Sequence, residues 1–198
     1  FGGVYWDKLI KDLATAFCEK NIQPNWYCVD AALKSADEID QLIEPFLNSD
    51  GAKSIFGKCY DGELIYLFDK QKLAKLKPDA KGINILYGTG AELAKWSGTL
   101  IYLDISKNEI QFRSRAGSFK NLGAAKIENA KAQYKRCYFI DWIMLNKHKQ
   151  QLLSKIDFIV DGQQTTFYPF TTGEVFRETL KHLSNNSFRA RPWFEPGV

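Results

Sequence analysis

The first clear pattern along the chain is an amphipathic helix, which we expect over residues 5–20. Its apolar residues recur at helical spacing with charged residues between them: Trp6, Leu9, Ile10, Leu13 and Phe17. A second helix is expected after Ser35, because the Ser-Ala-Asp-Glu sequence over residues 35–38 is typical of a capping box. Further helices are expected over residues 69–76, 91–96, 139–155 and 172–183, and after Ser106.

Short runs of apolar residues predict buried strands over residues 26–29, 83–87 and 99–105, and a last short strand is expected over residues 158–160. Residues 55–59 and 64–68 flank Asp61-Gly62 and predict a β-hairpin. Residues 117–136 are polar and weakly periodic, so an extended or partly helical excursion is expected there. The alternation of buried strands with helices predicts the α/β class, with a mostly parallel sheet in three layers.

The length and composition favour one domain with a single core. The chain has 198 residues, 45% of them hydrophobic, including 14 Phe, 9 Tyr and 5 Trp, and this aromatic content excludes a disordered chain. We find no internal repeat, and we expect a single α/β domain over residues 1–187 with an exit linker over residues 188–198. No apolar run approaches the roughly 18 residues that a membrane span needs, so no membrane partner is expected.

The charge is mild but unevenly distributed. A net charge of +4 is too small to indicate a nucleic-acid partner by itself. Residues 1–99 carry a net charge of −2 and residues 100–198 a net charge of +6, including all six Arg. An anionic ligand would therefore owe its charge contacts mainly to the second half.

The cysteines and histidines do not predict a metal site. The four cysteines form no CxxC pair and suit buried thiols in a reducing cytoplasm: Cys18, Cys28, Cys59 and Cys137. His148 and His182 are the only histidines, and both are expected on helices with exposed side chains. Zinc sites use clustered Cys and His, and this chain has no such cluster in its sequence.

Candidate ligand-binding residues follow the predicted strands, because ligands of parallel sheets bind beyond the carboxyl ends of the strands. Gly88, Thr89 and Gly90 lie between the strand over residues 83–87 and a helix, and either bind an anion through backbone N–H groups or only form a tight turn. Asp30 and Asp104 follow two other strands. Each either binds a cation or acts as a base, or caps the helix that follows it.

Basic residues of the second half form another candidate group. Arg113 and Arg115, with Lys135 and Arg136 downstream, either clamp a phosphate or carboxylate or form a solvated basic face. The chain has no GxxxxGK[ST] or GxGxxG motif, and no Ser-His-Asp or Cys-His arrangement. These residues alone indicate an anion pocket without a defined reaction.

Several segments together resemble the N-terminal region of long, two-part type I mannose-6-phosphate isomerases: YGTGAEL (87–93), LIYLDISKNEIQFRSRAG (100–117), NLG (121–123) and YKRCYFIDW (134–142). The tail FRARPWFEPGV (188–198) is similar to the join that leads into the metal-binding cupin part of those proteins. The resemblance runs from about Val4 to the end of the chain. It implies a downstream cupin domain as partner, zinc only in that cupin part, and no cofactor in this chain.

The same region is also similar to a phosphate-binding-loop (P-loop) kinase fold without an evident phosphate loop. Phe1-Gly2-Gly3-Val4 stands where the loop would be, with neither Lys nor Ser/Thr at the phosphate-binding positions. The resemblance implies an accessory domain that binds a sugar phosphate or nucleotide in the cytoplasm. One alternative is a kinase-like phosphotransferase with Asp30 as base, Arg113 and Arg115 in a lid and a phosphate loop upstream; another is a structural module that docks on the cupin.

Overall fold

The amphipathic stretch at the start of the chain folds as predicted into α1 (Trp6–Glu19) in our computed structural model, which describes residues 2–48 and 56–187. The second predicted helix is α2 (Ala36–Leu47), and its capping box is present. The Ser35 hydroxyl accepts a hydrogen bond from the Glu38 N–H at 3.3 Å, and the Glu38 carboxylate accepts one from the Ser35 N–H at 2.9 Å. Phe1, Ile55 and the expected exit linker over residues 188–198 lie outside the described residues.

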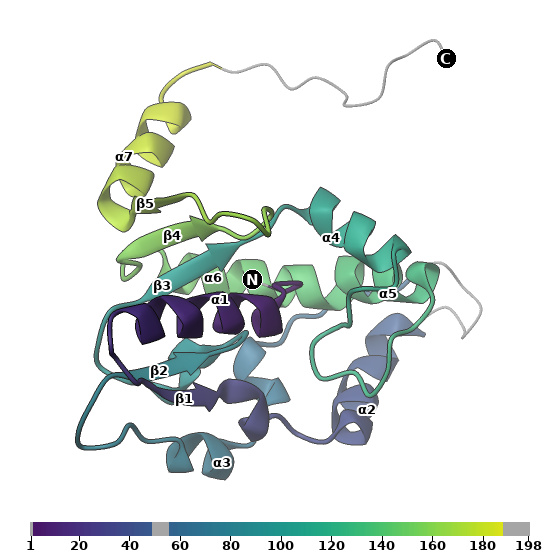
Figure 1. Cartoon of the computed structure of the whole chain (residues 1–198). Coiled ribbons are helices and arrows are strands. Elements are labelled where there is room, and N and C mark those ends of the chain that lie inside the picture. The colour runs from purple at the N-terminus through teal and green to yellow at the C-terminus, as the bar shows by residue number, and fades with distance from the viewer. Residues whose placement is uncertain (1, 49–55, 188–198) are drawn as a thin grey trace.

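The strands confirm the α/β class and pair in two small sheets (Figure 1). β1 (Asn25–Cys28) pairs in parallel with β2 (Asn84–Tyr87). β3 (Ile101–Asp104) pairs in parallel with β4 (Phe158–Asp161), which also pairs antiparallel with β5 (Phe170–Thr172). In Figure 1 these two sheets lie one above the other, with α1 in front and α6 behind.

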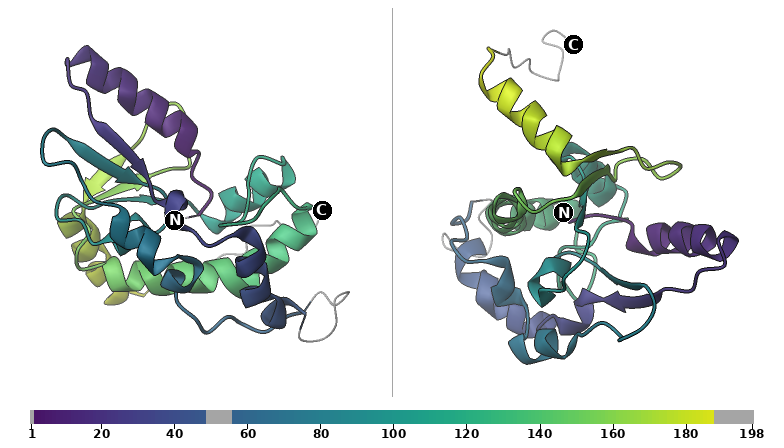
Figure 2. Two further views of the ribbon diagram at one scale, coloured as in Figure 1. Left: turned by 90° about the horizontal axis from the view of Figure 1, so that it is seen from below. Right: turned by 90° about the vertical axis from the view of Figure 1, so that its left-hand side faces the viewer.

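The remaining helices are α3 (Lys70–Lys75), α4 (Lys107–Arg115), α5 (Ala130–Arg136), α6 (Trp142–Leu152) and α7 (Gly173–Ser184). Three short 3-10 turns, η1 (Val29–Ala32), η2 (Leu64–Leu67) and η3 (Ala91–Ala94), and one π-helical turn, η4 (Cys137–Asp141), connect them. The π turn joins α5 to α6, so that the two form one continuous helical run. The helix α7 projects away from the rest of the domain in Figure 1 and in the right-hand view of Figure 2.

The core is one cluster to which both halves of the chain contribute. Many of its fully buried side chains come from α2, η2, α4, the π turn and α6: Ile39, Ile43, Leu64, Leu67, Ile110, Ile140 and Met144. Ile156, just before β4, belongs to the same cluster. The two sheets therefore share a core.

Three local predictions were wrong. Residues 64–67 form η2 and not the second strand of a hairpin, because Leu64 and Leu67, three positions apart, both turn into the core. β2 is only half-buried along its length, and so is β1, since a two-stranded sheet gives each strand a free edge. The segment after Gly90 is a single 3-10 turn and not a helix. In addition, the sequence did not predict β5, which is three residues long.

No helix among the residues that the structure describes is long and apolar enough to cross a membrane.

Candidate functional site

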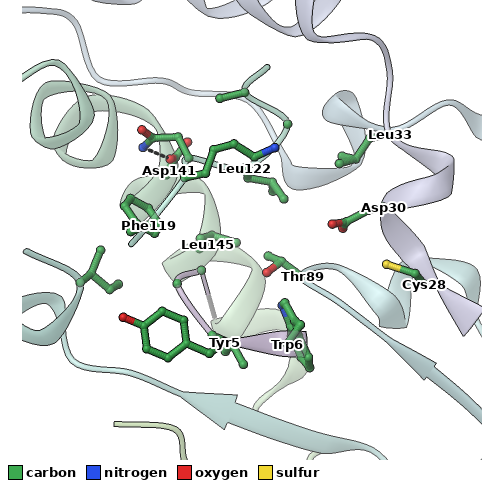
Figure 3. A pocket seen from close by; sticks show the side chains of 18 of the residues that line it. Tyr5, Trp6, Cys28, Asp30, Leu33, Thr89, Phe119, Leu122, Asp141 and Leu145 are labelled. Carbon is green, nitrogen blue, oxygen red and sulfur yellow. Dashed lines mark hydrogen bonds between the residues drawn. The ribbon is translucent and has the colours of Figure 1, made fainter. Parts of the chain in front are cut away.

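A cavity of about 1170 Å³ opens between the N-terminal turn, the ends of β1 and β2, the start of α2, the loop after α4 and the start of α6 (Figure 3). Its lining therefore comes from both halves of the chain. This volume lies slightly above the roughly 300–1,000 Å³ that is usual for small-molecule sites. This cavity is the candidate functional site.

The N-terminal turn forms one wall of the cavity. Gly3 adopts a φ of +89°, which favours glycine, and its carbonyl oxygen accepts a hydrogen bond from Arg113 Nη1 at 2.7 Å. The next residues start α1, whose N-cap residue Tyr5 makes no side-chain capping hydrogen bond. Residues 2–8 all line the cavity, so the first-turn N–H groups of α1, which have no acceptor within a helix, border it. The helix dipole favours a negative charge at this end.

Asp30 and Thr89 form the opposite wall, at the ends of the two parallel strands. Both side chains point into the cavity in Figure 3. Gly88, with φ at +117°, lets β2 end close to η1: a Cβ atom there would lie 2.7 Å from Val29 Cγ1. The close approach of these two strand ends is what places Asp30 beside Thr89.

The cavity walls also change the acidity of Asp30. Its carboxylate is exposed to the cavity, but the surrounding protein removes part of its hydration, and this desolvation raises its pKa; Lys120 nearby lowers it. Cys28, at the end of β1, also lines the cavity, and burial raises the pKa of its thiol. A hydrogen-bond donor or a cation in the cavity would therefore stabilise the charged form of Asp30.

The loop over residues 117–124 closes the cavity and is held in place by buried polar contacts. Asn121 donates a hydrogen bond to Asp141 Oδ2 at 2.7 Å, and Arg136 Nε lies 3.5 Å from Asp141 Oδ1. Gln133 Nε2 donates to the Phe119 carbonyl at 2.5 Å. Burial raises the pKa of Asp141, and Arg136 and Asn121 oppose that rise. This network fixes the loop that carries Lys120 to the cavity.

The charges that line the cavity are mixed. Four lysines and four carboxylates contribute: Lys8, Lys34, Lys72, Lys120, Asp7, Asp30, Glu38 and Asp141. Glu38 is bonded to the α2 cap, and Asp141 is paired with Arg136. Tyr5, Trp6 and Tyr87 add aromatic surface. The cavity thus offers cations, the two remaining carboxylates of Asp7 and Asp30, and aromatic faces to a polar ligand.

The structure brings together only some of the residues that the sequence singled out. Asp30 and Thr89 line the cavity, and Gly88 and Gly90 shape the turn that carries Thr89. Asp104 lies at the end of β3, where Lys149 Nζ donates to its carboxylate, and it does not line this cavity.

The basic candidates lie apart from these residues. Arg113 is 3% exposed and lies inside the fold. Arg115 lines a second cavity, between α4 and α5. Lys135 and Arg136 line a third cavity, of about 1000 Å³, beside α2. None of these three cavities is lined jointly by residues of the Gly88–Gly90 turn and by Arg113 or Arg115.

Two sequence expectations outside the site were wrong. His148 is only 8% exposed, because the face of α6 that carries it packs against the core. Cys18 and Cys59 are exposed, whereas Cys137 is buried as expected. Among the described residues, no group of three or more His, Cys, Asp or Glu is placed to hold a metal ion.

Sequence reasoning did not single out Lys120 or Asp141 as site residues. Lys120 lies in a loop without any motif of its own, and Asp141 lies in the π turn rather than at the end of a strand. The available signal was the NLG segment, which begins at Asn121, the residue that bonds to Asp141.

An α/β domain with a ligand-sized cavity at the ends of two parallel strands is thus the class of protein that the fold and the site define. The chain belongs to the family described as "Domain of unknown function (DUF8485)", whose model matches residues 1–185. No curated protein and no solved structure matches the chain.

Proposed function

We propose that this domain is an accessory, non-catalytic module that binds a phosphorylated small molecule, a sugar phosphate or a nucleotide, in the cavity described above. The observation that carries the proposal is the convergence of the uncapped N-terminus of α1 with Asp30 and Thr89 on one cavity. A phosphate at the start of α1 would satisfy N–H groups that no side chain caps. Lys120 would add positive charge beside it, whereas Lys8 is paired with Asp12 at 2.6 Å.

The opposite wall suits the rest of such a ligand. Asp30 would accept hydrogen bonds from sugar hydroxyls. The desolvation that raises the pKa of its carboxyl group also means that such donors would replace the hydration its carboxylate has lost. Trp6 and Tyr87 offer faces on which a sugar or a base can pack. A volume of about 1170 Å³ leaves room for a nucleotide as well as for a hexose phosphate.

The finer fold proposal is a P-loop-kinase-like, three-layer arrangement that has lost its phosphate loop. The glycine turn before α1 and the parallel pairing of β1 with β2 support it. Neither Lys nor Ser/Thr follows Gly3 at the positions where such a loop would bind phosphate and Mg²⁺, which supports binding without transfer.

The wider setting that we propose is the cytoplasm, as part of a mannose-6-phosphate isomerase-like protein with a downstream cupin domain as partner. The cysteines among the described residues are all free thiols, which suits a reducing compartment.

A panel of hexose phosphates and nucleotides, tested by thermal shift and then by calorimetry, examines the proposal. A ligand specific to the native state raises the unfolding midpoint by mass action, and Asp30→Asn should reduce the shift. Asp61→Asn makes the same charge change outside the cavity, and it should leave the shift unchanged. A panel without any stabilising ligand, or an equal loss in the two variants, would contradict the proposal.

A phosphotransferase is the second candidate, because Asp30 lies across the cavity from the start of α1, where a base would stand. Incubation with ATP, Mg²⁺ and each hexose phosphate distinguishes the two. We expect no phosphate release and no transfer. Turnover that Asp30→Asn abolishes and Asp61→Asn preserves would establish the second candidate.

A further inference from the structure

The second cavity differs in character from the first. It has a volume of about 420 Å³ and lies between α4 and α5. Its apolar and aromatic surface comes from Ile110, Tyr134, Cys137 and Trp142. Tyr134 contacts the Trp142 ring edge-on, with ring centroids 5.7 Å apart and planes at 84°. A pocket of this size, with an aromatic wall, fits a ligand of about one ring.

Its charge is of one sign. Arg115, at the end of α4, and Lys131, in the first turn of α5, line this cavity, and no carboxylate of the described residues does. No ion pair or hydrogen bond joins either side chain to another described residue. Two unpaired cations at the mouth of an apolar cavity attract an anionic group.

Trp142 provides an independent sign of a missing partner. The residue is 5% exposed, and its buried Nε1–H has no hydrogen-bond acceptor among the described residues. A buried donor without an acceptor costs free energy, and native structures usually supply a partner for it. An acceptor oxygen on a ligand in this cavity would satisfy it.

We propose that the cavity between α4 and α5 is a second ligand site, which takes a small organic oxyanion, a carboxylate or phosphate on an aromatic or apolar body of about one ring. Arg115 and Lys131 hold the oxyanion, Tyr134 and Ile110 pack on the body, and the Trp142 indole N–H donates to an oxygen of the ligand. The site differs from the first cavity, whose lining includes four carboxylates. Ile110, Cys137 and Trp142 line both cavities, so the two sites share a wall.

Phenyl phosphate and benzoate are the probes. Inorganic phosphate, which has the oxyanion but no ring, and the neutral benzyl alcohol, which has the ring but no charge, are the controls. We expect saturable binding of at least one of the two aromatic anions by calorimetry, and binding of each control at least about tenfold weaker, because each lacks one part of the recognition. Of the indole N–H signals in the NMR spectrum, that of Trp142 should move most. Competition between phenyl phosphate and benzoate then shows which head group the site prefers.

The double variant Arg115→Gln/Lys131→Gln removes the two cations at exposed positions, so the fold should persist. Its dissociation constant for the bound probe should rise about tenfold or more. Lys126→Gln/Lys181→Gln removes the same charge elsewhere and should change the constant by less than about twofold. Asp30→Asn, in the first cavity, should also leave it unchanged.

Three results would overturn the proposal. The first is the absence of saturable binding of both aromatic anions to the wild-type protein. The second is an equal loss of affinity in the Arg115→Gln/Lys131→Gln variant and in the Lys126→Gln/Lys181→Gln control. The third is a Trp142 indole signal that does not respond to a bound probe.

Discussion

At the scale of single residues, Arg113 shows how burial decides the role of a cation. Its guanidinium donates to the carbonyl oxygens of Gly3, Gly162 and Gln163 at 2.7, 3.1 and 3.1 Å. Its Nε donates to Glu109 at 2.8 Å, and the group stacks on the Tyr5 ring at 4.0 Å from the centroid. The side chain thereby ties the N-terminal turn to the loop after β4.

Arg113→Lys should therefore destabilise the protein by about 3 kcal/mol, because an ammonium group cannot reproduce the planar fork that reaches three carbonyls. Urea unfolding measures the change. Arg115→Lys, on the exposed side of the same helix, should stay within about 0.5 kcal/mol of wild type. Equal stabilities of the two variants would show that the Arg113 contacts contribute nothing.

His148 predicts a pH dependence of stability. Desolvation lowers its pKa from the ordinary value of 6.5. The unfolded state then binds more protons than the folded state between the two pKa values, so this contribution is complete above about pH 6.5 and is lost as the pH falls below it. His148→Asn should flatten the fall in unfolding free energy between about pH 7 and pH 5.

The control for this prediction is His182→Asn, since His182 is exposed on α7. That variant should keep the wild-type slope of unfolding free energy against pH. Parallel slopes for wild type and His148→Asn would mean that the buried imidazole does not cause the acid sensitivity.

The sequence indicated some of the site residues, whereas the roles of others depend on contacts between segments far apart in the chain. Asp30 and Thr89 were predicted because they directly follow strands, and strand ends of a parallel pair meet at one edge. Arg113 resembled a phosphate clamp because the sequence does not tell whether a cation's donors are taken up by carbonyls far along the chain. Lys120 reaches the cavity only because the buried Asn121–Asp141 contact fixes its loop.

At the scale of elements, helices with an N-cap signal were predicted best. Ser35, the predicted cap, accepts a backbone hydrogen bond in the structure, and so do Ser106 and Thr172, at the starts of two other predicted helices. The π turn over Cys137–Asp141 carries no comparable signal, since no capping side chain marks its start within the helical run. β5 forms because it pairs with the free edge of β4. That pairing depends on the folded sheet, so the three residues of β5 carry no signal for it in the sequence.

Gly173 is the point at which α7 meets the domain. It starts the helix, its N–H donates to the Asp157 carbonyl at 2.7 Å, and a Cβ atom there would lie 1.7 Å from the Ile156 carbonyl oxygen. Gly173→Ala should thus cost about 2–3 kcal/mol of unfolding free energy, despite the better helix propensity of alanine.

Thr179→Ala, on an exposed position of the same helix, provides the matched comparison and should change stability by less than about 0.5 kcal/mol. Urea unfolding of both variants gives the difference. A Gly173→Ala protein as stable as wild type would mean that the start of α7 can move away from Ile156 without loss.

At the scale of the whole molecule, the two small sheets do not define two folding units. Ile39 and Ile43 of α2 belong to the same buried cluster as Ile110, Ile140 and Met144 of the second half. The candidate site lies between these parts, with Asp30 and Thr89 from the first half and Lys120 from the second. A ligand there would bridge segments that the shared core already holds together.

Met144→Ala tests this unity, because Met144 is 0% exposed and belongs to α6, while Trp6, Trp26 and Trp96 belong to the first half. The cavity left behind should cost about 2–5 kcal/mol. If the domain unfolds in one step, tryptophan fluorescence and far-UV circular dichroism should shift together to lower urea concentration. Trp142 lies in α6 and should follow that helix in either case. A fluorescence transition whose main part stays at the wild-type midpoint, while the circular dichroism transition moves, would show instead that the first half folds independently of α6.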